Sequence, residues 1–220
     1  MSKKRIGALT IGQSPRPDLV APLKNLLPDC EILEAGALDN LTPDDLPKPS
    51  KVAYPLVTRM RNGKTVMVEE SFITAKLQLA LNLLETNGVI ATLLLCAGTF
   101  ANLQGTKPLF MPFKIGYNFL IALQMQSIGL ITPVAAQEIP IRARWKKMGW
   151  QPTVWTADLG VQDEAFHRQL KERIDTNNLD CIVLDYVGHP LAQVNQLQKY
   201  VEIPVIDLGL LAMVMLTSTL

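Results

Sequence analysis

The sequence contains few cysteines, and they follow no recognised pattern. There are three, Cys30, Cys96 and Cys181, and neither a C-x-x-C pair nor a zinc-type spacing of histidine and cysteine connects them. An odd number of scattered thiols argues against a disulfide framework and against a metal site. Free thiols are typical of a reducing compartment, so we expect a cytoplasmic protein.

Glycine-rich nucleotide motifs are missing as well. Neither G-x-G-x-x-G nor a Walker A motif follows any predicted strand. This absence removes the main support for binding of a dinucleotide or a nucleoside triphosphate. We therefore expect no cofactor.

An excess of charge and long apolar runs are also absent. The 21 Lys and Arg residues nearly balance the 20 Asp and Glu residues, so we expect no nucleic-acid partner and no anionic membrane partner. The apolar stretch behind the basic residues 3–5 is too short for an export signal. The apolar run at 208–216 is shorter than the roughly 20 residues that span a bilayer, and we interpret it as a buried helix. A small ligand remains the expected partner, with a homodimer as one possible assembly.

What the sequence does contain is an alternation of strand and helix patterns. At 220 residues and 48% hydrophobic content it can bury a sizeable core. Apolar residues at helical spacing predict a helix over 70–86, and two β-prone runs across Asn62-Gly63 predict a hairpin. Strands are predicted at 6–12, 30–38, 52–59, 64–68, 89–96, 109–113, 127–131, 153–157, 180–186 and 203–207. Further helices are predicted at 19–27, 118–126, from 134 through Arg144, at 163–176 with Asp163 as its cap, and at 191–200.

This alternation predicts an α/β fold with two doubly wound, Rossmann-like lobes of parallel sheet that face one cleft. Ligands of such sheets bind beyond the carboxyl ends of the strands. Polar or reactive groups follow four predicted strands, at 10–16, 96–99, 132–133 and 185–189. Their hydroxyls, together with backbone N–H groups at helix starts, suit a carboxylate.

Cys96 stands out among these groups because it ends a buried apolar run and is followed at once by Ala97, Gly98 and Thr99. This places a thiol at the ligand-binding edge of a sheet. The alternative is a small buried hydrophobic residue without chemistry. Cys30 and Cys181 lie at strand starts, on the opposite edge, and are interpreted as structural.

Several other residues allow two interpretations each. Arg16 is either a bidentate partner of a ligand carboxylate or a solvated loop charge. Arg59 lies on the surface, unless the hairpin folds over the cleft. Thr132, before Pro133, either binds an anion or caps a helix. His189 ends a strand at the same edge as Tyr186 and is a candidate acid, base or ligand contact.

Four segments carry a resemblance to a known family. They are LTIGQSPR at 9–16, TRMRNG at 58–63, LLCAGTF at 94–100 and LDYVG at 184–188. In this order, over nearly the full chain, they resemble the AroM-like proteins of the aspartate/glutamate/hydantoin racemase superfamily. The resemblance implies two pseudo-symmetric lobes, one formed by residues 1–115 plus 205–220 and the other by 116–204.

Racemases of that superfamily place one cysteine on each side of the substrate α-carbon. Cys96 matches the first cysteine, but Tyr186 stands where the second would follow Asp185. A phenol, with an ordinary pKa of about 10, is a poor base near neutrality. One cysteine suits decarboxylation, cis-trans isomerisation through a covalent adduct, or protonation of an enolate on one face.

Two hypotheses therefore stand. In the first, the chain is a cofactor-independent isomerase, racemase or decarboxylase that uses Cys96 and Tyr186 next to a carboxylate. In the second, it is a catalytically inactive relative that binds or senses a small ligand. The ligand-binding residues expected under either hypothesis are Thr10, Gln13, Ser14, Arg16, Arg59, Ala97, Gly98, Thr99, Thr132, Pro133, Asp185, Gly188 and His189.

Overall fold

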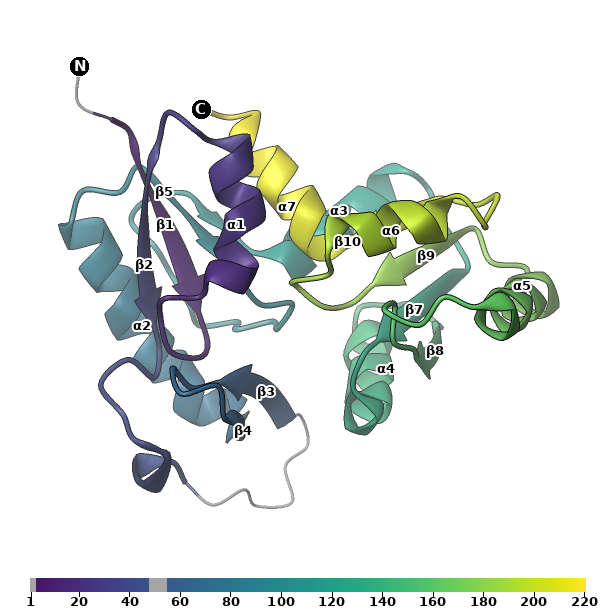
Figure 1. Cartoon of the computed structure of the whole chain (residues 1–220), viewed down its shortest axis with the longest axis horizontal. Coiled ribbons are helices and arrows are strands. Elements are labelled where there is room, and N and C mark those ends of the chain that lie inside the picture. The colour runs from purple at the N-terminus through teal and green to yellow at the C-terminus, as the bar shows by residue number, and fades with distance from the viewer. Residues whose placement is uncertain (1–2, 48–54) are drawn as a thin grey trace. The chain divides into compact units, whose positions relative to one another are not determined.

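The computed structural model describes residues 3–47 and 55–220 (Figure 1). These residues form an α/β fold whose two main sheets are entirely parallel. The chain divides into two compact units, Met1–Lys114 with Ala212–Leu220 and Ile115–Leu211. The predicted fold class is thereby confirmed. The first residues of the predicted hairpin, 52–54, lie outside the described residues.

The first unit is built on a sheet with the strand order β2-β1-β5-β6. Its strands are β1 (Arg5–Thr10), β2 (Glu31–Gly36), β5 (Ala91–Leu94) and β6 (Leu109–Phe110). The chain runs from β1 through α1 (Pro17–Leu26) outward to β2, and then crosses back over β1 to reach β5. The two connections diverge between β1 and β5, and the carboxyl ends of these strands are the place where doubly wound sheets bind ligands.

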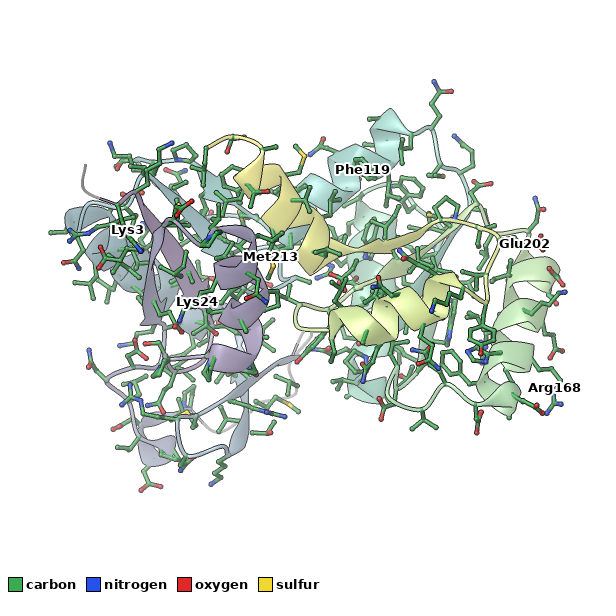
Figure 2. All side chains as sticks on the ribbon, turned by 45° about the horizontal axis from the view of Figure 1, so that its top comes forward. Lys3, Lys24, Phe119, Arg168, Glu202 and Met213 are labelled. Atoms are coloured by element: carbon green, nitrogen blue, oxygen red, sulfur yellow. The ribbon has the colours of Figure 1, made fainter. Side chains whose placement is uncertain are left out.

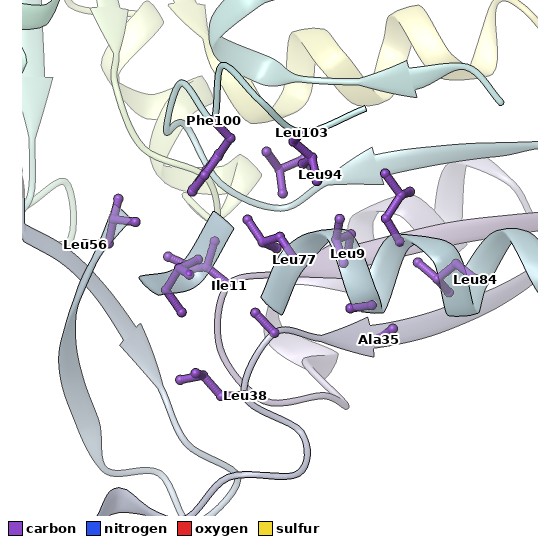
Figure 3. Close-up of a cluster of buried hydrophobic side chains, with 14 of the residues drawn as sticks. Leu9, Ile11, Ala35, Leu38, Leu56, Leu77, Leu84, Leu94, Phe100 and Leu103 are labelled. Carbon is purple, nitrogen blue, oxygen red and sulfur yellow. The ribbon is translucent and has the colours of Figure 1, made fainter. Parts of the chain in front are cut away.

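Helix α2 (Glu70–Thr86) covers this sheet with the apolar face that its sequence predicts. Ile73, Leu77, Leu81 and Leu84 are each at most 2% exposed. They pack in one cluster with Leu9 and Leu94 of the central strands (Figure 3). The core of the first unit therefore lies directly behind the strand ends that carry Thr10 and Cys96.

The second unit repeats this topology. Its strands are β7 (Ile128–Thr132), β8 (Thr153–Thr156), β9 (Cys181–Leu184) and β10 (Val205–Asp207), in the order β8-β7-β9-β10. Counted along the chain, both sheets have the order second, first, third, fourth. Their connecting helices are α4 (Glu138–Lys147), α5 (Glu164–Asn177) and α6 (Leu191–Gln198). As predicted, Asp163 caps α5 by accepting a hydrogen bond from the Phe166 N–H at 2.8 Å.

Some boundaries differ from those expected. Helix α3 spans Pro112–Ala122 rather than 118–126, because Pro112 starts a helix readily and ends the strand before it. The expected first lobe included 205–220, but β10 pairs in parallel with β9 inside the second unit, and the first unit resumes at Ala212. The structure assigns the C-terminal helix α7 (Leu208–Thr217) to both units.

A hairpin of β3 (Pro55–Arg59) and β4 (Thr65–Glu69) completes the first unit.

The outer surface carries charged side chains, of which the exposed Arg168 and Glu202 are examples (Figure 2). None of the described helices is long and apolar enough to cross a bilayer.

Candidate functional site

Cys96 lies two residues beyond β5, and its side chain is only partly buried. Its Sγ accepts a hydrogen bond from the Gly98 N–H at 3.3 Å. An N–H donor stabilises a thiolate more than a thiol, because the charged sulfur is the stronger acceptor. The loop therefore supplies one group that favours the reactive form of Cys96.

The loop that carries Cys96 is held in shape by Phe100. Phe100 has a φ of 36°, in the left-handed region that side chains other than glycine rarely adopt. Its ring is fully buried in the first unit's core, beside Leu94 and Leu103 (Figure 3). A Cβ on Gly98 would lie 2.5 Å from this ring, so only glycine fits there. Packing thus maintains a strained turn directly behind the thiol.

The loop after β1 begins with Thr10, which is 2% exposed. Its hydroxyl oxygen accepts from the Gly12 N–H at 3.3 Å. Gln13, three residues further on, is also buried, and its amide donates to the carbonyl oxygens of Leu38 and Leu41 at 3.0 and 2.9 Å. The Gln13 Oε1 accepts from the Arg61 N–H at 2.6 Å. Gln13, predicted as a ligand contact, is used to fasten this loop to its neighbours.

Ser14 is bound in a similar way, by an aspartate that sequence reasoning missed. Its N–H and its hydroxyl donate to the two carboxylate oxygens of Asp39, at 2.6 and 2.8 Å. The Gly36 N–H donates to the same carboxylate at 2.7 Å. The Arg61 guanidinium donates twice to the Ser14 carbonyl oxygen, at 2.9 and 2.8 Å. The signal for this turn was an aspartate directly after the strand predicted at 30–38, which is three residues past the end of β2.

The two predicted arginines differ in their surroundings. Arg16 makes a bidentate ion pair with Asp18, at 2.9 and 2.7 Å, and its guanidinium holds the pKa of the Asp18 carboxyl below the ordinary value. Arg59 is exposed, and its carbonyl oxygen accepts from the Gln13 N–H at 3.1 Å. The hairpin therefore packs on the loop after β1 in its own unit.

In the second unit, the loop after β7 matches the loop after β1. Thr132 is fully buried, and its hydroxyl oxygen accepts from the Val134 N–H at 3.4 Å, two residues on, as Thr10 accepts from Gly12. Pro133 is exposed. Neither threonine hydroxyl lies on an open surface.

The loop after β9 matches the loop after β5. Leu184 pairs with Ile131 of β7 as Leu94 pairs with Leu9 of β1. Tyr186, two residues on, consequently holds the position that Cys96 holds in the first unit. The structure thus brings the two predicted catalytic residues to equivalent places in their own sheets.

Asp185, between Leu184 and Tyr186, is 3% exposed and belongs to a buried ion pair. Its Oδ2 accepts from the Arg144 guanidinium and, at 2.7 Å, from the Trp145 indole N–H. Both partners lie on α4, and sequence reasoning missed both, because no local pattern indicates a partner about forty residues away. Asp185 is therefore part of the framework beneath Tyr186.

His189 completes the loop after β9. Gly188, with a φ of 114°, turns the chain so that His189 Nδ1 lies 3.0 Å from Asp207 Oδ2. The Tyr186 and His189 rings meet edge to face, with centroids 5.4 Å apart. Sequence reasoning also missed Asp207. The signal was available, because Asp207 ends the strand predicted at 203–207 and ligands bind beyond the carboxyl ends of such strands.

No three His, Cys, Asp or Glu side chains within residues 3–47 and 55–220 are grouped as metal ligands. Cys181 is fully buried, and burial raises the pKa of its thiol to about 12. Cys30 is partly buried, in the turn before β2.

Residues 6–219 match the model of the AroM protein family. The chain belongs to the AroM family. The comparison with curated proteins gave no match.

Solved structures with the same fold include several enzymes. Unliganded arylmalonate decarboxylase has a TM-score of 0.64 at 13% identity, over 99% of this chain and 92% of that one. Allantoin racemase from Klebsiella pneumoniae has a TM-score of 0.64 at 15% identity, over 98% of this chain and 87% of that one. A Nocardia farcinica maleate cis-trans isomerase mutant with a covalently bound succinylcysteine intermediate has a TM-score of 0.62 at 14% identity, over 100% and 94%. At these identities the likeness shows the fold.

Proposed function

We propose that this AroM-family chain binds a small carboxylate at the strand ends beside Cys96, and that Cys96 acts on the bound molecule. The observation that carries the proposal is the hydrogen bond from the Gly98 N–H to Cys96 Sγ, in a strained turn at the divergence point of a doubly wound sheet. Strain that packing maintains is typical of functional sites, whereas a cysteine that only fills space needs neither strain nor a donor.

Two of the enzymes that share the fold support the proposal that the ligand is a small carboxylate. The names of arylmalonate decarboxylase and maleate isomerase state substrates that are dicarboxylates. In this chain, the partly buried Thr99 in the Cys96 loop is the proposed contact, whereas the buried Thr10 and Thr132 hydroxyls accept hydrogen bonds within their own loops. Gln13, Ser14, Arg16 and Asp185 hold the surrounding loops through the hydrogen bonds described above.

The proposed reaction is cofactor-independent and occurs next to the carboxylate. In a decarboxylation, CO₂ leaves and the Cys96 thiol donates its proton to the enolate carbon, after which solvent reprotonates the thiolate. In a cis-trans isomerisation, the thiolate adds to a double bond, the single bond rotates, and elimination restores the thiolate. Both routes need one thiol on one face of the substrate.

A second candidate function is ligand binding without turnover, and one observation favours it. Tyr186 holds the place equivalent to Cys96, and a phenol is a poor base near neutrality. A chain with this substitution is suited to sensing a small carboxylate or to regulating a partner.

The test compares the wild type with Cys96→Ser and, as the matched control, Cys30→Ser. Each protein is incubated in D₂O with small dicarboxylates, hydantoins, and maleate or arylmalonate, and NMR follows deuterium incorporation, isomerisation and loss of CO₂. We expect turnover by the wild type and the control, and a loss of about 100-fold or more in Cys96→Ser. Equal turnover in all three proteins would refute the role of Cys96.

Binding is measured separately by thermal shift with the same compounds. A ligand at 100 times its Kd adds about 2.7 kcal/mol to the native state, or roughly 5 to 10 °C for a chain of this size. Binding without turnover supports the second candidate function. A wild type that neither binds nor converts any of these compounds contradicts both.

A further inference from the structure

The second unit contains an imidazole that is oriented by a buried carboxylate, and the proposed function does not use it. Asp207 is the last residue of β10 and pairs with Leu184, the last residue of the neighbouring strand β9, and His189 lies in the loop after β9. Their side chains are 7% and 5% exposed, and Nδ1 lies 3.0 Å from Oδ2. The pair therefore lies at the carboxyl edge of the second sheet, where Tyr186 also lies.

Both oxygens of the Asp207 carboxylate have donors, which fixes its orientation. Oδ2 meets His189, and Oδ1 accepts from the Leu210 N–H at 2.7 Å. Asp207 directly precedes α7, and the positive end of a helix dipole favours a charged carboxylate. A Cβ on Gly209 would lie 3.2 Å from Asp207 Oδ1 and 3.1 Å from the Val187 side chain, so the small residue permits this close approach.

A charged carboxylate has only acceptors, so the proton between the two groups belongs to His189 Nδ1. A neutral imidazole then has its lone pair on Nε2. Within residues 3–47 and 55–220, Nε2 has no hydrogen-bond partner. An imidazole can also both take up and give up a proton, and it is the most frequent general acid and base in enzymes.

We propose that His189 Nε2 is a proton-transfer group at the carboxyl edge of the second sheet, acting on a bound carboxylate compound, and that Asp207 is its positioning residue. As a base, Nε2 takes a proton from the substrate carbon, leaving an imidazolium and an enolate. As an acid, the imidazolium returns that proton and becomes neutral again. This inference rests on the proposed function.

The first experiment does not depend on activity. The chain has two histidines, so ¹⁵N-histidine spectra contain two imidazoles, and His189→Gln assigns them. We expect the Nδ1–H tautomer for His189. In Asp207→Asn, the Leu210 N–H needs the amide oxygen, so the NH₂ group faces Nδ1 and we expect the tautomer to change to Nε2–H. An Nε2–H tautomer in the wild type overturns the proposal.

The second experiment measures deuterium incorporation into the substrate. We expect His189→Gln to reduce it about 100-fold, Asp207→Asn to reduce it similarly, and the matched control His167→Gln to leave it unchanged. Full activity in His189→Gln together with a loss in Cys96→Ser overturns this inference alone. A wild type that neither exchanges nor otherwise converts any of these compounds overturns the proposed turnover and this role with it. Thermal unfolding near that of the wild type shows that each variant is folded.

Discussion

The two units use one backbone design for different side chains. In each, a threonine ends the first strand and accepts from the N–H two residues on, and the third strand is followed by a short loop with glycine at its fourth position. The first unit then presents Cys96 above an apolar Leu95, whereas the second presents Tyr186 above the ion-paired Asp185. Equivalent positions in the two units thus share their backbone geometry, whereas the side chains at these positions differ in their chemistry.

The largest effect is expected where Asp185 is replaced by its apolar counterpart. Asp185→Leu copies Leu95 and leaves the Arg144 guanidinium buried without its carboxylate. We expect a loss of about 3 to 5 kcal/mol in the free energy of unfolding. All three tryptophans, Trp145, Trp150 and Trp155, lie in the second unit, so denaturant unfolding followed by fluorescence reports this unit alone.

The control for Asp185→Leu is the double variant with Arg144→Leu. It removes both charges, and apolar replacement of a buried ion pair is often neutral. Recovery of most of the lost stability is expected. A double variant as unstable as Asp185→Leu would show that the buried charge is not the cause.

The change in unfolding free energy expected for Cys181→Ala is intermediate in size and depends on pH. It begins β9 as Ala91 begins β5, so Cys181→Ala copies the first unit. Burial raises the pKa of its thiol to about 12, above the ordinary value of about 8.5. The stabilising contribution of the protonated thiol is complete below pH about 8.5 and is lost as the pH rises towards 12. The wild type should therefore lose up to about 1.4 kcal/mol per pH unit relative to Cys181→Ala.

The measurement for Cys181 is denaturant unfolding of both proteins at several pH values between 8 and about 11. Comparing the two proteins cancels the titration of lysines and tyrosines, which they share. Parallel stability curves would contradict the prediction. In the same range, Cys181 should resist thiol reagents in the folded wild type.

The smallest change in stability is expected at the two equivalent glycines, Gly98 and Gly188, which are required for different reasons. Gly98→Ala places a Cβ against the Phe100 ring, whereas Gly188→Ala forces an alanine to a φ of 114°. We expect each to cost about 1 to 2 kcal/mol, measured by unfolding followed by circular dichroism. Phe100→Leu should relieve Gly98→Ala and leave the cost of Gly188→Ala unchanged. Equal coupling in both double-mutant cycles would show that the two loops are constrained alike.

The elements of the fold were readable from local patterns. The helix over 70–86 matches α2, because burial on one face imposes a spacing that the sequence must show, and the continuous apolar run predicted as a strand at 89–96 contains β5. Helix α3 was misplaced, since its apolar residues continue on all sides and give no clear face. Cys96 and Tyr186 are predicted to end their strands, and in the structure each lies two residues beyond the end of one.

The sequence by itself determined that this chain forms alternating parallel α/β units and that a thiol ends one of their strands. Only the tertiary structure decided which distant groups meet: the Gln13 side chain with the Arg61 N–H, Asp185 with Arg144, and His189 with Asp207. The physical reason is that periodicity records whether a residue faces the core, whereas an ion pair or hydrogen bond depends on which distant strand ends the topology brings together.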